Sequence, residues 1–93
     1  MKTQRAEVLV YRTAHCPFCL SAVELLNRSG VQFEEIHLDD DRDRRRTTSA
    51  ILPGHHTVPL IVIDGTPIGG FEDLRRLEGE GELERLVFAA EGS

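Results

Sequence analysis

The sequence predicts an α/β domain in which parallel and antiparallel strands share one sheet and helices pack against it. Three features of the chain indicate this class. Short apolar runs alternate with helical apolar patterns in the first half, as in a strand–helix–strand–helix order. The second half holds two short strand patterns joined by Asp64-Gly65, a strong two-residue hairpin signal. Helical patterns close the chain, so the expected order is βαβαββα with a C-terminal helix.

Length and composition indicate one ordinary globular domain over residues 1–93, with its core over about residues 7–90. Apolar residues make up 40% of the chain and charged residues 29%. The net charge of −5 argues against nucleic-acid binding, and no run of about 18 apolar residues is present to span a membrane. The first residues lack the apolar stretch of a signal peptide, so we expect a cytoplasmic protein, monomeric by default.

The first strand and helix follow from apolar spacing and from stop signals. Val8–Tyr11 is a nearly continuous apolar run, which is typical of a central strand buried on both faces. A helix from about Pro17 to Arg28 carries its apolar residues at helical spacing, and Gly30 is a suitable left-handed stop. Val31–Leu38 reads as the second strand, and a connection of this length makes it parallel to the first.

The second predicted helix, from about Asp41 to Leu52, is rich in arginine and poor in apolar residues. Its arginines lie at 42, 44, 45 and 46, with aspartates at favourable i, i+4 spacing. Such a run could bind nucleic acid or an anionic partner. Because arginine beside aspartate on a helix is more often a solvated face, we interpret it as one.

The second half of the chain contains a hairpin followed by two helices. Leu60–Ile63 reads as a third buried strand, and Thr66–Ile68 returns antiparallel, with Pro67 suggesting the sheet edge. A short helix over Phe71–Leu77 and a final helix from about Glu80 to Ala90 follow from their apolar spacing.

The only two cysteines, Cys16 and Cys19, stand between the first strand and the first helix. This placement of a Cys-x-x-Cys pair is the signature of thiol–disulfide redox chemistry. A helix N-terminus has unpaired N–H groups and partial positive charge, so it stabilises a thiolate at Cys16. Pro17 fits the first helical turn because its missing N–H is not needed there. We therefore expect an exposed nucleophile, Cys16, with Cys19 nearly one turn further in.

Two other roles for the cysteines are weaker. A structural disulfide here would close a loop of only a few residues and would constrain the unfolded chain very little. A zinc site normally needs four ligands, and no second paired motif supplies them, so we predict no metal ligand. His15, directly before the nucleophile, either assists a leaving thiol or is an exposed loop residue.

Three segments taken together resemble the glutaredoxins, small members of the thioredoxin fold. They are Cys16-Pro17-Phe18-Cys19, Thr57-Val58-Pro59 and Gly69-Gly70-Phe71-Glu72-Asp73, in this order. The resemblance implies a four-stranded mixed sheet flanked by helices. The first strand is central and parallel to the second, the third lies antiparallel beside the first, and the fourth is at the edge. It also implies a cis bond before Pro59, although sequence alone favours trans.

The resemblance implies a dithiol enzyme, with Cys16 and Cys19 as catalytic residues, that reduces disulfide-bearing and glutathionylated proteins. Glutathione would be the reducing co-substrate, and no bound cofactor is expected. The Val58 backbone would pair with glutathione, and N–H groups near Glu72 and the Asp73 carboxylate would hold its γ-glutamyl end. The implied glutathione-binding residues are Thr13, Phe18, His55, Thr57, Val58, Pro59, Gly70, Phe71, Glu72 and Asp73.

The chain departs from the family pattern where positive charge is usual. Many glutaredoxins carry a lysine at the position of Thr13, and a cation near the position of His55 and His56. Arg12 is adjacent, but on a strand it would point to the other side. One alternative is therefore a redoxin reduced by thioredoxin reductase or by another small thiol. Another is an iron–sulfur or metal carrier, which Pro17 tends to disfavour in the family.

Overall fold

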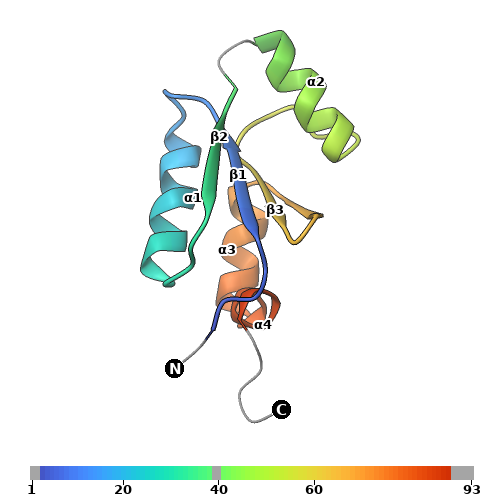
Figure 1. Cartoon of the computed structure of the whole chain (residues 1–93). Coiled ribbons are helices and arrows are strands. Elements are labelled where there is room, and N and C mark those ends of the chain that lie inside the picture. Colours follow the sequence, from blue (N-terminus) through green and yellow to red (C-terminus); the bar gives the residue numbers. More distant parts are fainter. Residues whose placement is uncertain (1–2, 39–40, 89–93) are drawn as a thin grey trace.

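The computed structural model describes residues 3–38 and 41–88 of the chain. Strands and helices alternate in the first half, and a hairpin and two helices complete the second (Figure 1). In order, the elements are β1 (Val8–Arg12), α1 (Pro17–Arg28), β2 (Glu34–His37), α2 (Asp41–Ile51), β3 (Leu60–Ile63), β4 (Thr66–Gly69), α3 (Phe71–Gly79) and α4 (Glu82–Val87).

The four strands form one mixed sheet in the order β2-β1-β3-β4. β1 pairs with β2 in parallel and with β3 antiparallel, with Val10 opposite Glu35 on one side and Ile61 on the other. β4 pairs only with β3 and forms an edge of the sheet. Proline, which has no N–H to donate to a neighbouring strand, is tolerated on such an edge strand, and Pro67 lies there. The predicted fold class and strand arrangement are confirmed.

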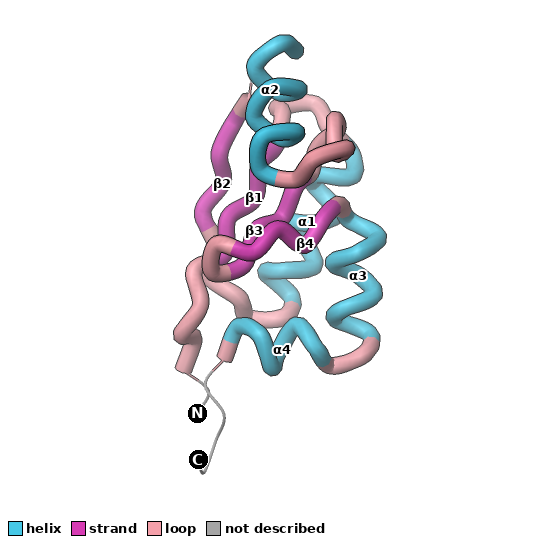
Figure 2. The backbone as a smooth tube through the Cα atoms, turned by 90° about the vertical axis from the view of Figure 1, so that its right-hand side faces the viewer, coloured by secondary structure: helices cyan, strands magenta, loops and turns pink. Residues whose placement is uncertain are grey.

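Strand direction brings four connections to one end of the sheet. β1, β2 and β4 run the same way, whereas β3 runs the opposite way. The residues that follow β1, β2 and β4 therefore meet the residues that precede β3. We call this the site end; α1 and α3 begin there, and α2 also lies there (Figures 1 and 2).

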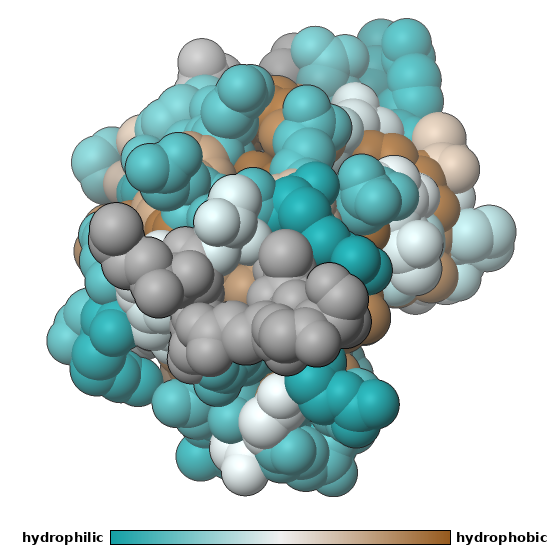
Figure 3. All heavy atoms as spheres, turned by 60° about the horizontal axis from the view of Figure 1, so that its bottom comes forward, coloured by the Kyte–Doolittle hydropathy of each residue, from teal (hydrophilic) through white to brown (hydrophobic). Residues whose placement is uncertain are grey.

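The core lies between the sheet and the paired helices α1 and α3, which lie side by side on one face (Figures 1 and 2). Leu26 and Leu74 face Val10 and Ile61 in this cluster, and all four are fully buried. α4 adds Leu83 and Val87 at the opposite end. Figure 3 views that end, where hydrophilic side chains cover most of the visible surface. No described helix combines the length and apolar character needed to cross a bilayer.

Two local turns follow the sequence signals closely. Gly30 adopts a left-handed φ of 74° after the C-cap Ser29, as the stop signal predicted. Asp64 and Gly65 have φ of 51° and 82°, the two positive values that a type I′ hairpin turn requires. These turns fix where α1 ends and where β3 reverses.

Several predicted boundaries are wrong. β2 covers Glu34–His37 rather than Val31–Leu38, because a strand extends only as far as its single partner, β1, pairs with it. The last helix begins at Glu82, after a left-handed Gly81, and ends at Val87, because Phe88 is already extended. The expected continuation to Ala90 lies outside the described residues.

Burial of β1 also differs from the prediction. Its residues alternate between buried and half-buried, with Leu9 and Tyr11 on the less covered face. β3 is the strand that is buried throughout. The reason is the one-sided arrangement of α1 and α3, which leaves the other face of β1 with thinner cover.

The packing of α1 gives a direct stability test. Leu26→Ala should lower the free energy of unfolding by about 2–5 kcal/mol, because it empties a fully buried position between helix and sheet. Leu20→Ala is the matched control on the same helix, since Leu20 is 55% exposed. It should change stability by less than about 0.5 kcal/mol in the same urea titration. Equal losses would contradict this assignment of the core.

Candidate active site

Cys16 is the N-cap residue of α1, and its sulfur takes part in the cap. The residue is extended, with φ −113° and ψ 109°, and its Sγ accepts the backbone N–H of Cys19 at 3.2 Å. Pro17 occupies the first turn as predicted. The helix start therefore presents a backbone donor to the sulfur. Cys16 is half-buried, so the prediction of an exposed nucleophile was too simple.

Cys19 is fully buried behind Cys16, and both thiols are free. Burial is the largest cause that raises the pKa of Cys19 to about 12, and the hydrogen bond with Cys16 raises it further. The backbone of Thr13 and the charge of Arg12 oppose this shift. The two cysteines are therefore unequal. Cys19 is buried and its thiol stays neutral, whereas Cys16 is partly exposed to solvent.

The loop before β3 places a backbone carbonyl at the sulfur. The Val58–Pro59 peptide bond is cis, as the resemblance implied and sequence alone did not. The Cys16 thiol donates to the carbonyl oxygen of Val58 at 3.6 Å, across 42 residues of sequence. Pro59 is buried and Val58 half-buried, so this loop forms a fixed wall beside the nucleophile.

The turn into α3 forms a second wall. Gly69 has a left-handed φ of 127°, and a Cβ there would lie 2.8 Å from the Asp73 carboxyl carbon. The N–H of Gly70 donates to Asp73 Oδ2 at 3.1 Å. The next N–H groups of the first helical turn have no partner within the helix, so they are available to an anion. Glycine is required here because the backbone and the Asp73 carboxylate approach so closely.

A ring contact joins the second wall to the cysteine segment, and a close backbone approach joins the two walls to each other. The Phe18 and Phe71 rings are 6.3 Å apart between centroids, tilted by 33°. Phe71 thus borders the site as well as the core. A Cβ on Gly70 would lie 3.6 Å from the Pro59 carbonyl oxygen and 3.8 Å from His55 Cε1. The three sequence segments of the resemblance therefore meet at the site end.

Other predicted residues lie further from the sulfur. Thr13 is half-buried, and its backbone forms a hydrogen bond with Cys19. Thr57 and Glu72 are exposed, and Glu72 pairs with Arg75 at 2.7 Å. Arg12 is 8% exposed and forms an ion pair with Glu35 at 2.6 Å, so it does not replace the cation absent at Thr13. His15 is exposed, as the simpler of its two interpretations predicted.

His55 has an unusual environment. Its Nε2 is buried and has no hydrogen-bond partner among the described residues. An unpaired buried nitrogen is costly unless a ligand completes it. The ring lies beside Gly70, and its Nε2 is shielded from solvent.

A basic pocket borders the site and was missed by the sequence analysis, which interpreted the arginine run as a solvated face. Its volume is about 650 Å³. It is lined by Arg44, Arg45, Arg46, Ser49, His56 and Thr57. Only the approach of α2 to the Thr57 loop creates it, and the sequence gives no direct signal of that approach.

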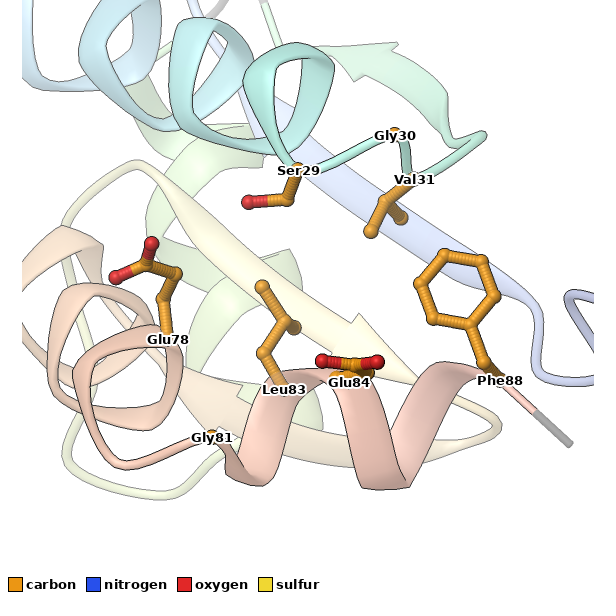
Figure 4. A pocket seen from close by; sticks show the side chains of 8 residues that line it. All are labelled: Ser29, Gly30, Val31, Glu78, Gly81, Leu83, Glu84 and Phe88. Carbon is orange, nitrogen blue, oxygen red and sulfur yellow. The ribbon is translucent and has the colours of Figure 1, made fainter. Parts of the chain in front are cut away.

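A separate hollow of about 480 Å³ lies at the opposite end of the molecule (Figure 4). Leu83 and Phe88 extend from the region of α4 toward Val31, with Glu78 at its side. None of the predicted site residues lines it. No group of three or more His, Cys, Asp or Glu in residues 3–38 and 41–88 is placed to hold a metal ion.

Comparison with known proteins identifies the family. The family model described as Glutaredoxin matches residues 8–68. The chain belongs to the glutaredoxin family. The glutaredoxin of Pseudomonas aeruginosa is 44% identical over 82 residues, covering 88% of this chain and 96% of that protein. The wheat glutaredoxin crystal structure matches with a TM-score of 0.76 and 30% identity, covering 86% of this chain and 76% of that one.

A more distant structure shares this glutaredoxin's fold. The crystal structure of the buckwheat glutaredoxin–glutathione complex matches with a TM-score of 0.79 and 24% identity, covering 88% of this chain and 76% of that one. The family assignment makes this protein a thiol–disulfide oxidoreductase, as predicted. Cys16 and Cys19 lie close together at the start of α1, which is consistent with a Cys-x-x-Cys site for this chemistry.

The unequal cysteines give a test by alkylation. At about pH 8 the reduced protein should take up iodoacetamide at Cys16 alone, because Cys19 is buried and its pKa of about 12 keeps it protonated. Peptide mapping by mass spectrometry reads the label. In urea both cysteines should react, which serves as the control. Equal labelling of both in the folded protein would contradict the assigned geometry.

Proposed function

We propose that this glutaredoxin uses glutathione to reduce protein disulfides and glutathione mixed disulfides, in the cytoplasm where thiols are kept reduced. One observation carries the proposal: the Cys16 sulfur lies against the Val58 backbone, 3.6 Å from its carbonyl oxygen. A cysteinyl backbone attached to that sulfur would run beside Val58, where an extended peptide can pair with main-chain groups.

The proposed reaction balances as two thiol–disulfide exchanges. The Cys16 thiolate attacks the glutathione sulfur of a mixed disulfide, the bond to the protein sulfur breaks, and the protein thiol leaves after taking up a proton. Glutathione, as its thiolate, then attacks the Cys16–glutathione bond, which yields oxidised glutathione and free Cys16. For a protein disulfide, Cys16 first attacks one sulfur and the other leaves as a thiol, which gives a Cys16–substrate mixed disulfide. Cys19 then loses its proton and attacks Cys16 Sγ, so the second substrate thiol leaves and a Cys16–Cys19 disulfide forms. Two glutathione molecules reduce this disulfide and become one oxidised glutathione.

The groove offers groups for the rest of the tripeptide. The free N–H groups at the start of α3 suit the γ-glutamyl carboxylate, and the Asp73 carboxylate suits the ammonium. Asp73 is held for this by the Gly70 N–H, although it also pairs with Arg76 at 3.2 Å. The buried, unpartnered Nε2 of His55 supplies one further polar group toward a ligand beside Gly70.

The buckwheat protein was solved with glutathione, and its likeness to this chain is one of fold. The glutathione assignment therefore rests on the groove residues of this chain. Thr13 carries no charge and Arg12 is paired with Glu35, so we expect weaker binding of the glycyl carboxylate of glutathione. This observation motivates the second candidate, a redoxin served by thioredoxin reductase or another small thiol.

The cysteine variants test the proposed steps. Cys16→Ser should abolish all thiol transfer because the attacking sulfur is gone. Cys19→Ser should keep deglutathionylation, which needs only Cys16 and glutathione, and lose dithiol reduction of protein disulfides. Initial rates on a glutathionylated peptide and on a protein disulfide, with glutathione and glutathione reductase, measure both. Turnover that appears only with thioredoxin reductase and NADPH would sink the glutathione assignment.

A charge-neutral variant tests the groove. Asp73→Asn should raise KM for glutathione about fivefold, because the amide oxygen can still accept the Gly70 N–H while the charge facing the ammonium is lost. Glu82→Gln is the matched control: both side chains are 40% exposed and both pair with an arginine three residues on. Its KM should stay at the wild-type value. An equal rise in KM for glutathione in both variants would contradict a role of Asp73 in binding glutathione.

A further inference from the structure

Arg12 is an arginine in a position where the sheet otherwise buries apolar side chains. Side chains alternate along a strand, so Arg12 shares with Val8 and Val10 the more deeply buried face of β1. It is 8% exposed, whereas the two valines are 2% and 0% exposed. A charged side chain is buried this far only where specific partners compensate for its lost hydration.

Two groups hold the Arg12 guanidinium at the last residue of β1. Its Nη1 donates to Glu35 Oε1 on the neighbouring strand β2 at 2.6 Å. Its Nε donates to the backbone carbonyl of Thr13 at 3.3 Å. A positive charge is therefore fixed at the site end of the sheet, in direct contact with the segment that leads to Cys16.

This fixed charge acts on the buried cysteine. Burial raises the pKa of Cys19 to about 12, and the hydrogen bond and charge of Cys16 act in the same direction. The hydrogen bond from the Thr13 backbone and the charge of Arg12 act in the opposite direction. Glu35, on β2, balances part of the Arg12 charge. Arg12 and the residue that it contacts are thus what opposes the cost of an anion at Cys19.

The dithiol route needs that anion, because a thiolate and not a thiol attacks a disulfide. A buried positive charge stabilises it more strongly than an exposed one, since water and salt screen the buried charge less. We propose that Arg12 is a positioning residue for the step in which Cys19 attacks Cys16. Fixed by Glu35 and by the Thr13 carbonyl, it holds the Thr13 backbone at Cys19 and supplies positive charge where the thiolate forms. The inference deepens the proposed function and rests on its dithiol route.

The test separates the two exchanges with dithiobis(nitrobenzoate), whose released thiolate is coloured. The Cys16 thiolate attacks one sulfur of the reagent and releases one nitrothiobenzoate, at a rate that rises with reagent concentration. Cys19 then gives its proton to solvent and attacks Cys16 Sγ, which releases the second nitrothiobenzoate and forms the Cys16–Cys19 disulfide. The second phase does not depend on reagent concentration, so stopped-flow absorbance at high reagent concentration resolves it.

Arg12→Gln should slow the second phase about threefold and leave the first unchanged; the loss is modest because a more basic thiolate is also more nucleophilic. Arg12→Lys keeps the charge and should retain most of the wild-type rate. Arg12→Met suits a buried position and should lose as much rate as Arg12→Gln, even where the two differ in stability. Arg85→Gln removes an exposed, ion-paired arginine on α4 and should leave both phases unchanged.

The role of Arg12 is overturned by equal slowing of both phases, or by a loss with lysine as large as that with glutamine. In the Cys19→Ser background only one nitrothiobenzoate is released, and Arg12→Gln should not change its rate. A slower release there would assign Arg12 to Cys16 and overturn the inference. No step of this test uses glutathione. Turnover only with thioredoxin reductase would therefore refute the glutathione assignment while a slower second phase in Arg12→Gln still supported this one.

Discussion

The site depends on one short interaction: the Cys16 sulfur accepts the Cys19 N–H at the first turn of α1. This contact makes Cys16 part of the helix cap, so the sulfur position is set by the backbone. The same contact makes the two cysteines unequal, because Cys19, which donates its N–H, has its own side chain buried in the core. Burial then holds the Cys19 thiol neutral, with its pKa raised to about 12.

A helix cap alone would leave this sulfur on an open surface. The antiparallel return of β3 brings the Val58 carbonyl to it, and β4 brings Gly70 and α3 to the same end. The tight turn at Asp64 and Gly65 makes this possible, because it reverses the chain within two residues and keeps β4 short. A rigid hairpin therefore positions two binding walls that are far from Cys16 in sequence.

The sequence was most informative where a residue has few conformational choices. Gly30, the hairpin glycine and Pro17 act locally, so the elements that they bound were predicted closely. The ends of β2 and α4 were not, because pairing with β1 and the left-handed Gly81 decide them. The cysteines were evident from spacing, and the cis bond came only through the family resemblance. The basic pocket had no local signature, since it exists only where α2 meets the Thr57 loop.

Positive charge in this chain lies mainly away from the groove. The positions near the groove that usually carry a cation hold Thr13 and two histidines, and the adjacent Arg12 is buried against Glu35. Positive charge is concentrated instead on α2, whose arginines line a pocket together with Thr57, the sequence neighbour of Val58. If glutathione is the co-substrate, as proposed, a cation in the groove would act on every turnover, so its absence at Thr13 bears directly on how well glutathione is used.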